Sequence, residues 1–503
     1  MPLVKPAELV PLAEFDRVHF VGIGGAGMSG IARVMLARGV PVSGSDQADS
    51  GTLKELESLG ARVCVGHDAA NLGDADTLVV SSAIREDNVE LAEARRRGLR
   101  VVHRAGALAA LASDHRVIAV TGTHGKTTTT SMIATILLGA GAAPGYVIGG
   151  TLASTGVNAA DGAGGDFVAE ADESDGSFLM LSPDAAVITN VDADHLDNYG
   201  TVEAYRASFT AFGDRIVPGG LLVTCADDPG AVEVAAHARS RGLRVVTYGE
   251  SAGANYRVSQ ISITGMTTAF TVAAPGGAGQ QDGPGGADGP GGADRPGDAE
   301  ATGADHAPRV LRAQVAVPGR HNALNGTAAL AVAIELDISP EVALAALAGY
   351  RGAARRLEPK GEARGIRVLD TYAHHPVELA ADLATAREIA AGTGGGRVIA
   401  VFQPHLYSRT RIFAAEFGVA LGLADVAVVL DVYAAREDPE PGVTGRLVAD
   451  AVPGGARYVP LAADIPRAVA AIAEAGDLVL TMGAGDVTRL GPLILAEIAA
   501  GAH

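Results

Sequence analysis

The sequence predicts an α/β protein of three domains, each with a mainly parallel sheet. Two observations support this prediction. First, 503 residues are more than one hydrophobic core usually serves. Second, short apolar runs rich in β-branched residues alternate with helical patterns, and glycine-rich or polar segments follow these runs where parallel strands would end. We expect the domains at residues 1–114, 115–353 and 354–503.

The first domain begins with a strand, a glycine loop and a helix. The apolar run Val18 to Val21 precedes Gly22 to Gly27 (GIGGAG), and a helical pattern follows from Met28 to Ala37. A second strand, Val40 to Gly44, leads to Asp46, about 20 positions past the glycines, where dinucleotide folds contact a ribose. The pattern predicts a Rossmann-like domain for a ligand with a diphosphate. The alternative is a glycine turn that only packs.

The central domain is organised around the segment TGTHGKTTTT, Thr121 to Thr130. It follows the apolar run Val117 to Val120 and leads into an apolar-periodic helix. Gly122 and Gly125 allow a tight loop whose backbone N–H groups, together with the helix N-terminus, favour an anion. The order of strand, glycine loop and helix predicts a phosphate-binding loop.

Two side chains of this loop have the chemistry of a nucleoside triphosphate site. Lys126 can reach the β- and γ-phosphates, and the hydroxyl of Thr127 can ligate Mg²⁺. A strict GxxxxGKT motif needs a glycine where this chain has Val120, so the loop is the shorter GTHGKT that starts at Gly122. We therefore predict a P-loop ATPase-type parallel sheet with ATP as its ligand. A glycine turn that binds nothing is the alternative.

Acidic groups follow two later strands of the central domain. The strand 167–169 precedes Glu170 to Asp175, and the strand 186–189 precedes Asn190 to Asp197. Ligands of parallel α/β sheets bind at the carboxyl ends of strands, and carboxylate oxygens suit magnesium. We expect these segments to face the phosphates and their metal, although solvated acidic loops are the alternative.

A low-complexity segment, 274–308, interrupts the central domain. Its middle repeats a six-residue step three times, DGPGGA, DGPGGA and DRPGDA, from Asp282 to Ala299. Such a composition has little to bury and cannot offset the entropy of ordering. We expect a disordered surface insertion between two strands, Tyr256 to Val272 and Val310 to Val317.

Four strands of the third domain precede polar segments. The strands are 367–369 before DTYAHHP, 398–402 before QPHLYSR, 426–430 before DVYAARED and 477–480 before TMGAGD. This pattern predicts a second Rossmann-like parallel sheet with a ligand-facing edge. The adjacent His374 and His375 should point in different directions, so we do not expect them to share a metal ion.

Composition excludes several classes of function. A net charge of −19 argues against nucleic acid as a partner, because binding it requires clustered Lys and Arg. No uncharged apolar run reaches the length of a membrane span, and the start MPLVKPAELV lacks a signal-peptide core, so we expect a cytoplasmic protein without membrane insertion. Cys64 and Cys225 lie in apolar surroundings without a CxxC partner and are predicted to be buried thiols.

The oligomeric state cannot be predicted from the sequence, which favours neither a monomer nor a homodimer.

These residues predict a phosphoryl-transfer enzyme whose second substrate is itself a nucleotide conjugate. Several motifs together resemble the Mur ligases, which form amide bonds with ATP in peptidoglycan precursor synthesis: TGTHGKTTTTS, EADESDGSF, ITNVDADHLDNY, PGRHNALN, GAARRLE and YAHHP. The resemblance covers essentially the whole chain. The segments HFVGIGGAGMSGIA, SSAI and FQPHLYSRT are most similar to the branch of the family that adds L-alanine.

The resemblance implies a reaction and its substrates. ATP would phosphorylate the lactyl carboxylate of UDP-N-acetylmuramate to an acyl phosphate, and the amine of L-alanine would displace phosphate. Two Mg²⁺ ions are implied beside the ATP. Peptidoglycan synthesis and the cytoplasm are the implied setting.

The resemblance also assigns roles to residues of this sequence. Those implied in catalysis are Lys126, His195, His374 and Arg355. Those implied in ATP binding are Gly122, Thr123, His124, Gly125, Lys126, Thr127, Thr128, His321, Asn322, Asn325 and Arg356. Those implied around the UDP-sugar are Gly24, Gly25, Gly27, Ser29, Asp46 and Ser81. Those implied in amino-acid binding are Tyr372, His405 and Arg409, and the metal ligands are Thr127, Glu170 and His195.

Some of these assignments leave alternatives open. Either Arg355 or Arg356 matches the arginine that reaches the phosphates from the third domain. His374 is the candidate that helps the amine lose its proton, and a purely structural hydrogen bond is the alternative. The sister ligases carry a lysine that becomes carbamylated, whereas the aligned stretch Tyr205 to Phe209 has none, which puts such a bridge in doubt.

The sequence departs from the usual family pattern at two further places. Asp370-Thr371 stands where two aspartates are common, and Leu357 stands where an aromatic residue is usual.

Three other functions are alternatives to this assignment. The nearest is the recycling ligase that attaches a whole tripeptide to the same nucleotide sugar, but its first glycine loop contains a cysteine that this chain lacks. A dinucleotide-dependent oxidoreductase or a non-catalytic binding module would leave Lys126 and the metal carboxylates without a role.

Overall fold

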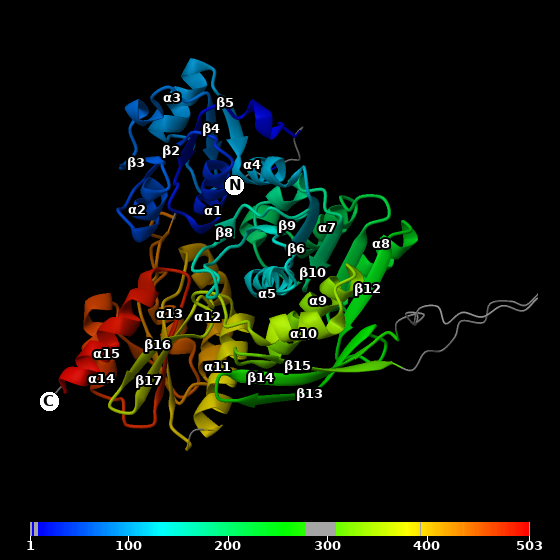
Figure 1. The fold of residues 1–503 in the computed structure, drawn as a ribbon. Helices are drawn as coiled ribbons and strands as arrows, with labels where there is room; N and C mark the ends of the chain where they lie inside the picture. Colours follow the sequence, from blue (N-terminus) through cyan, green and yellow to red (C-terminus); the bar gives the residue numbers. More distant parts are fainter. Residues whose placement is uncertain (1–2, 5–8, 277–307, 393, 436, 502–503) are drawn as a thin grey trace, which may run out of the picture.

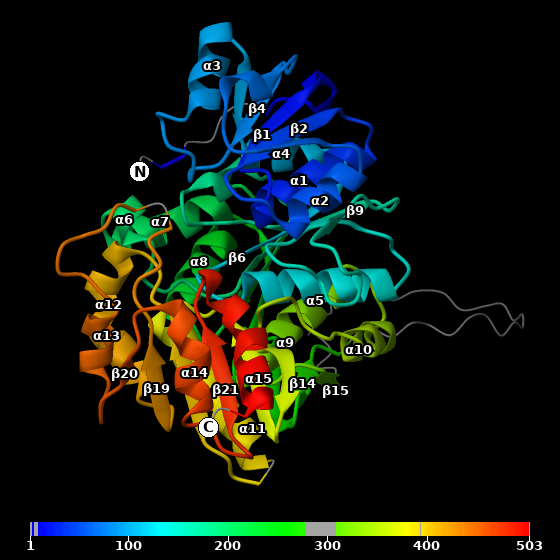
Figure 2. The same cartoon turned by 90° about the vertical axis from the view of Figure 1, so that its left-hand side faces the viewer.

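The computed structural model describes residues 3–4, 9–276, 308–392, 394–435 and 437–501. It is an α/β structure with three sheets in three domains that follow one another along the chain (Figure 1). The N-terminal domain lies at one end of the molecule, and the third domain packs beside the central one in both views (Figures 1 and 2). The expectation of a disordered insertion at 274–308 falls almost wholly outside the described residues.

The first domain contains a five-stranded parallel sheet with the strand order β3-β2-β1-β4-β5. Its strands are β1 (Val18–Val21), β2 (Val42–Asp46), β3 (Arg62–Val65), β4 (Thr77–Val80) and β5 (Arg100–His103). Its α-helices are α1 (Ala26–Ala37), α2 (Gly51–Ser58), α3 (Val89–Arg97) and α4 (Arg104–Ala112). This order is the Rossmann arrangement, and the predicted glycine loop joins β1 to α1.

The central domain contains a ten-stranded sheet with the order β15-β14-β13-β12-β11-β10-β6-β9-β7-β8. Its strands are β6 (Arg116–Thr121), β7 (Gly145–Val147), β8 (Ala159–Ala160), β9 (Asp166–Glu170), β10 (Ala185–Ile188), β11 (Leu221–Cys225), β12 (Arg244–Gly249), β13 (Tyr256–Thr264), β14 (Thr267–Ala274) and β15 (Arg309–Val315). Seven adjacent strands of this sheet are mutually parallel, in the order β13, β12, β11, β10, β6, β9 and β7. At the edges, β8 is antiparallel to β7, β14 to β13, and β15 to β14. The α-helices are α5 (Lys126–Gly139), α6 (Leu196–Tyr199), α7 (Val202–Gly213), α8 (Pro229–Ser240), α9 (Arg320–Glu335) and α10 (Pro340–Ala348).

The prediction of one strand from Tyr256 to Val272 was wrong. Two antiparallel strands, β13 and β14, occupy this stretch, with Thr264 opposite Thr267 across a two-residue turn. Gly265 takes a φ of +58° there, a conformation that glycine adopts easily. Strand β15 pairs with β14 so that Ala274 lies opposite Arg309.

The third domain contains a six-stranded sheet with the order β16-β17-β21-β18-β19-β20. Its strands are β16 (Glu358–Ala363), β17 (Ile366–Thr371), β18 (Val398–Phe402), β19 (Val426–Val429), β20 (Arg457–Tyr458) and β21 (Leu478–Met482), of which β16 is antiparallel. The α-helices are α11 (Pro376–Gly392), α12 (Tyr407–Leu421), α13 (Arg446–Ala451), α14 (Ile465–Ala470) and α15 (Leu490–Ala500). Short 3₁₀ helices complete the fold at Leu12–Glu14, Ala69–Leu72, Ser177–Met180, Ala462–Asp464 and Asp486–Arg489.

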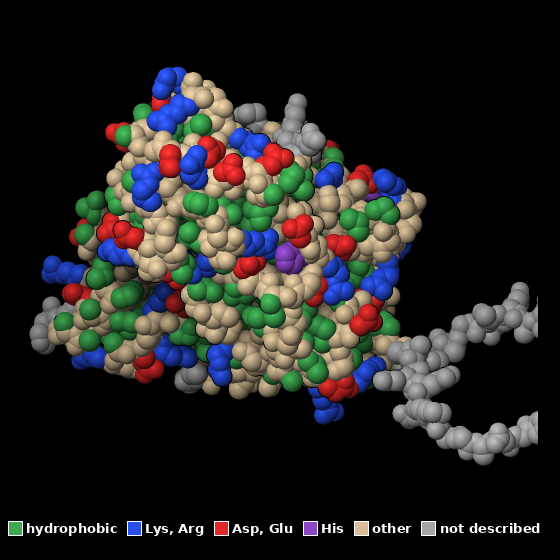
Figure 3. Space-filling view, turned by 45° about the horizontal axis from the view of Figure 1, so that its top comes forward, with side chains coloured by type: hydrophobic (Ala, Val, Ile, Leu, Met, Phe, Trp, Pro, Cys, Tyr) green, Lys and Arg blue, Asp and Glu red, His purple; other side chains and the backbone are tan. Residues whose placement is uncertain are grey.

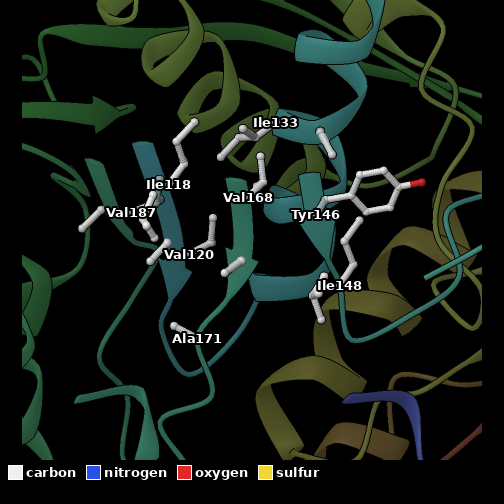
Figure 4. Close-up of a cluster of buried hydrophobic side chains, with 14 of the residues drawn as sticks. Ile118, Val120, Ile133, Tyr146, Ile148, Val168, Ala171 and Val187 are labelled. Atoms are coloured by element: carbon white, nitrogen blue, oxygen red, sulfur yellow. The ribbon is translucent and has the colours of Figure 1, made fainter. Parts of the chain in front are cut away.

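The buried apolar side chains show how the domains depend on one another. One continuous cluster runs from the first domain into the central domain. In the central domain it packs β6, β9 and β10 against α5, for example through Ile118, Val168, Val187 and Ile133 (Figure 4). The third domain has two clusters of its own. The first two domains therefore share a core, and the third is packed separately.

Candidate active site

The phosphate loop joins the carboxyl end of β6 to the N-terminus of α5. Gly122 and Gly125 have φ values of +132° and +83°. A Cβ on Gly122 would lie 2.0 Å from Thr189 Oγ1, and a Cβ on Gly125 would lie 2.8 Å from Asn325 Oδ1. Both the backbone conformation and the space therefore require glycine, as an anion-binding turn at a helix N-terminus does.

Lys126 is held by the loop and by one buried carboxylate. Its ammonium group donates to the carbonyls of Gly122 (2.7 Å) and Thr123 (3.1 Å) and to Glu173 Oε1 (2.8 Å). His195 Nε2 lies 3.7 Å from the same Glu173 oxygen. Burial raises the pKa of Glu173 to about 8, with a further contribution from Asp172, while Lys126 opposes the shift. Lys126 and His195 therefore meet at one carboxyl group.

Thr127 connects the loop to a second carboxylate and to the third domain. Its hydroxyl donates to Glu170 Oε1 at 3.0 Å, and Glu170 Oε2 accepts from the backbone N–H of Gly149 at 2.7 Å. Arg356 Nη2 donates to Thr127 Oγ1 at 3.3 Å. The two oxygen groups predicted to bind magnesium, on Thr127 and Glu170, are thus in direct contact. Among the described residues, neither Thr127 nor Glu170 makes a hydrogen bond or ion pair with His195.

The side chain of His124 points from the loop toward the third domain. Its Nδ1 lies 3.1 Å from Glu378 Oε1, and its Nε2 lies 3.7 Å from Asp192 Oδ2. Burial alone would lower the pKa of His124, but the nearby carboxylate of Asp192 and the hydrogen bond with Glu378 raise it to about 9. The imidazole is therefore positively charged at neutral pH and joins two domains.

A cavity of about 340 Å³ lies between the central and third domains, beside the phosphate loop. Its lining includes these predicted ATP-binding residues: His124, Gly125, Thr128, His321, Asn322, Asn325 and Arg356. The amide of Asn325 is held by Thr129 Oγ1 (3.3 Å) and Asn322 (3.4 Å), and burial lowers the pKa of His321 to about 4. The cavity thus adjoins the phosphate loop and is mixed apolar and polar, as a nucleoside requires.

A second cavity, of about 140 Å³, lies between the same two domains. His195 and Asp194 line it from the central domain, and His374, His405 and Arg409 line it from the third. Arg409 Nη2 donates to Asp194 at 3.2 Å, and both side chains are buried. Burial alone would raise the pKa of Asp194, but Arg409 holds it well below its usual range. Two of the three predicted amino-acid residues therefore meet here.

His374 is neutral and oriented by its own strand end. Burial lowers its pKa to about 4. Its Nδ1 lies 3.0 Å from the carbonyl of Tyr372, which accepts the hydrogen bond, and 3.4 Å from Glu378 Oε2. The predicted difference in direction of the two adjacent histidines is observed, because His375 instead contacts the ring of His124.

The two neighbouring arginines at the start of the third domain face different ways. Arg355 has a φ of +61°, and its guanidinium donates to Asp370 (3.4 Å) and to the carbonyls of Gly483 and Ala484. Arg356 instead reaches the phosphate loop. Both guanidinium groups lie near the ring of Tyr372, 4.9 and 5.4 Å from its centroid. Arg355 and Tyr372 thus make no contact with the phosphate loop among the described residues.

The predicted UDP-sugar residues lie at the glycine loop of the first domain, with two exceptions. The N–H of Gly24 donates to Asp46 Oδ2 at 2.9 Å, Gly25 is the exposed residue before α1, and Gly27 lies under the guanidinium of Arg104. Ser29 is buried inside α1, and Ser81 follows β4.

The burial of Ser29 is explained by a contact between domains, and the sequence did not identify Arg104 as a basic residue near the glycine loop. Asn158 of the central domain donates to Ser29 Oγ at 3.1 Å, so Ser29 belongs to the contact between two domains. Arg104 at the start of α4 forms a partly buried ion pair with Asp172 of the central domain at 2.5 Å. Its position at a strand end was the only signal in the sequence.

Three other residues of the site were not assigned from the sequence. Glu173 and Asp194 lie inside the acidic segments that were predicted to face the phosphates, but nothing singled them out. Glu378 lies one helical turn after His374, a spacing that places two side chains on one face. That spacing was the available signal for Glu378.

The outer surface adds little to this description. Acidic and basic side chains are interspersed on the face shown in Figure 3. Among the described helices, none is long and apolar enough to cross a membrane.

Comparison with known proteins gives consistent matches. The family model for the Mur ligase family, catalytic domain, matches residues 17–116, the Mur ligase middle domain matches 120–282, and the Mur ligase, glutamate ligase domain matches 355–485. The UDP-N-acetylmuramate--L-alanine ligase of Thermobifida fusca is 54% identical over 99% of this chain and 100% of that protein. The protein of the same name from Kineococcus radiotolerans is 53% identical over 97% of both chains.

Solved structures show the same architecture. The UDP-N-acetylmuramate-alanine ligase MurC of Thermotoga maritima superimposes with a TM-score of 0.77 at 28% identity, over 97% of this chain and 100% of that chain. A murein peptide ligase from Psychrobacter arcticus has a TM-score of 0.70 at 24% identity over 97% of this chain and 100% of its own. At that identity the second match shows the fold alone.

Proposed function

Because the chain belongs to the Mur ligase family, we propose that it joins L-alanine to the lactyl carboxylate of UDP-N-acetylmuramate in an ATP-dependent reaction of peptidoglycan precursor synthesis. The products are UDP-N-acetylmuramoyl-L-alanine, ADP and phosphate. The observation that carries this proposal is the series of contacts between the two cavities. Lys126 follows the loop that borders the larger cavity, His195 lines the smaller one, and Glu173 contacts both side chains.

The proposed reaction has two steps, one beside Lys126 and the other beside His195. A carboxylate oxygen of the sugar attacks the γ-phosphorus of ATP, and ADP leaves. The ammonium group of L-alanine loses one proton, the amine nitrogen attacks the acyl carbon, phosphate leaves, and the nitrogen gives up a second proton so that one N–H remains on the amide. Lys126 is placed to stabilise the negative charge of the transferred group, which supplies much of the rate of phosphoryl transfer. It must first exchange its hydrogen bonds to Gly122 and Thr123 for phosphate oxygens.

The residues beside Lys126 fit magnesium. A hydroxyl on Thr127 and a carboxylate on Glu170, 3.0 Å apart, are the oxygen ligands that Mg²⁺ prefers. Bound Mg²⁺ would neutralise phosphate charge. The resemblance assigns Thr127 to one ion and both Glu170 and His195 to a second. Because Glu170 contacts Thr127, we assign Thr127 and Glu170 to one ion and His195 to the other. Arg356, rather than Arg355, is our choice for the arginine that reaches the phosphates, because only Arg356 contacts Thr127.

The smaller cavity suits a small amino acid. At about 140 Å³ it has room for L-alanine, and Arg409 offers a buried cation for the carboxylate. His374 donates through Nδ1 to the carbonyl of Tyr372, which leaves Nε2 as the nitrogen able to accept a proton. Its low pKa makes it a weak base, so we assign it to orientation of the amine. We propose the cytoplasm as the location of the reaction, because the peptidoglycan precursor synthesis of this family implies that setting.

The test is phosphate release from ATP with UDP-N-acetylmuramate and one acceptor at a time. L-alanine, D-glutamate and the L-alanyl tripeptide are compared at equal concentration. We expect release with L-alanine alone. Release with the tripeptide would assign the chain to cell-wall recycling, and no release with any acceptor would reject the ligase assignment.

An isotope experiment tests the acyl phosphate separately. If the lactyl carboxylate carries ¹⁸O, the attacking oxygen remains on the phosphate that leaves in the second step. We expect one ¹⁸O in each released phosphate by mass spectrometry. Unlabelled phosphate would show that the carboxylate is never phosphorylated.

A further inference from the structure

Three metal-ligating side chains from two domains converge beside the nucleotide cavity. A nitrogen of His124, a carboxylate oxygen of Asp192 and a nitrogen of His375 all lie within 4.8 Å of one another. His124 belongs to the phosphate loop, Asp192 to the segment after β10, and His375 to the segment after β17 of the third domain. We propose that these residues form a Zn²⁺ site that connects the third domain to the phosphate loop. Binding of the metal alone tests this site, so the proposal does not depend on the ligase reaction.

The state of His375 is the main reason to assign a ligand here. Its side chain is only 4% exposed, and neither ring nitrogen has a hydrogen-bond partner among the described residues. Its ring centroid lies 4.9 Å from that of His124. A buried polar group without a partner costs free energy, and coordination would satisfy it.

His124 has the orientation of a metal ligand. Its Nδ1 pairs with Glu378 Oε1 at 3.1 Å, so its Nε2 is the nitrogen directed toward Asp192, at 3.7 Å. Metal-bound histidines usually donate their other ring N–H to a carboxylate in this way, which fixes the tautomer. Nε2 has no hydrogen-bond partner among the described residues. A metal ion would replace the proton that lies between His124 and Asp192.

The donor set selects the kind of metal. Two imidazole nitrogens and one carboxylate oxygen match Zn²⁺ with a fourth position for water, whereas Mg²⁺ prefers oxygen ligands. The site is distinct from the predicted magnesium ligands, which share none of these residues.

Metal binding has a structural consequence. Ligand atoms around tetrahedral zinc lie about 3.3 Å apart, given bond lengths of about 2.0–2.1 Å. The present separations therefore shorten when the ion binds. Because His375 belongs to the third domain, this shortening draws that domain toward the phosphate loop. Since His124 and Asp192 also line the nucleotide cavity, bound Zn²⁺ is expected to inhibit turnover.

Calorimetric titration of the full-length protein with ZnCl₂, in excess Mg²⁺, tests the site. We expect one Zn²⁺ per chain, with affinity at least tenfold weaker in His375→Gln and in Asp192→Asn. His237→Gln is the matched control, because His237 is a surface histidine paired with Asp214 at 2.9 Å, and it should bind as the wild type does. Equal affinity in His375→Gln, or no binding by the wild type, would overturn the proposal.

Two further measurements keep the outcome unambiguous. His195→Gln removes the histidine of the predicted magnesium site, and we expect Zn²⁺ binding to persist in it. Loss of binding in His195→Gln with retention in His375→Gln would place the ion at the magnesium site and reject the proposal. With Co²⁺ in place of Zn²⁺, the wild type should show the visible absorption of a tetrahedral nitrogen and oxygen site. This measurement needs no variant to fold, and an octahedral spectrum would contradict the assignment.

Discussion

The ammonium group of Lys126 donates to Glu173 Oε1 at 2.8 Å, and Glu173 has no exposed surface. The lysine of the phosphate loop is thus held in place before nucleotide arrives. His195 lies 3.7 Å from the same oxygen and lines the smaller cavity, so one buried carboxyl group contacts both the lysine of the phosphate loop and a histidine of that cavity. The contact brings the proposed sites of phosphoryl transfer and amino-acid addition next to each other.

Replacement of Lys126 by alanine should abolish turnover. The loss of a cation at the transferred group costs about 100-fold or more in rate. Phosphate release under saturating substrates measures it, and circular dichroism checks the fold. Lys54→Ala is the control, because Lys54 is exposed and pairs with Asp49 at the surface. Activity of Lys126→Ala within tenfold of wild type would reject the phosphate-loop assignment.

Replacement of Arg409 by alanine should raise the KM for L-alanine. Hydrogen bonds to charged groups contribute about 1.5–3 kcal/mol, which corresponds to about 10- to 100-fold. The KM for ATP should change much less. Arg411→Ala is the matched control from the same helix, because Arg411 is exposed and pairs with Glu440 at 3.0 Å. An unchanged KM for L-alanine in Arg409→Ala would remove this arginine from the amino-acid site.

Glu90 should contribute to stability in a pH-dependent way. It is fully buried in the first domain and accepts from Ser45 Oγ (2.5 Å) and Asn71 Nδ2 (2.7 Å). Burial would raise its pKa, but the imidazole of His19 at 3.6 Å and the hydrogen bonds from Ser45 and Asn71 lower it from 4.5 to about 2. Because the pKa of the folded state is the lower one, the stabilisation is complete above pH 4.5 and disappears as the pH falls toward 2. The shift corresponds to about 3 kcal/mol.

The measurement is urea unfolding of Glu90→Gln between pH 7 and pH 3. The variant should be less stable than wild type by about 3 kcal/mol at pH 7, and the difference should shrink below pH 4.5. Glu57→Gln, at an exposed position of α2 in the same domain, serves as the control. A difference that stays constant down to pH 3 would show that the Glu90 charge has no part in the effect.

Removal of residues 275–308 should leave activity within twofold of wild type. Ala274 and Arg309 are paired across β14 and β15, so an Asn-Gly turn can replace the segment without moving either strand. Phosphate release and the melting temperature are the measurements. A Gly/Ser segment of the original length is the control, and a large loss of activity in both variants would show that the native segment has a function.

The phosphate loop could be predicted from the sequence because its strand, glycines, lysine and helix are contiguous. The same holds for most strands of the first and third domains, where an apolar run is followed by a polar segment. Strands β3, β16 and β20 were not predicted. The boundaries of strands were harder to predict. The turn at Gly265 lies inside a run of alternating apolar and polar residues that continues on both sides, so the sequence predicts one strand where the structure has two.

The contacts between domains could not be predicted. Glu378 lies 254 residues from His124, and their pairing depends on how the third domain packs. The choice between Arg355 and Arg356 depends on the left-handed backbone at Arg355, which a non-glycine residue rarely adopts and no local pattern signals. Sequence motifs therefore identified the chemistry, and the packing of the domains determined which side chains meet.

The apolar core that runs from the first domain into the second also bears on how the chain unfolds. Side chains that share one core are expected to lose their packing together, and the third domain, whose clusters are its own apart from contact with Met266, is expected to unfold as a second unit. On this basis we expect three sheets but two cooperative units. A newly made chain would then complete one unit before the third domain has been synthesised.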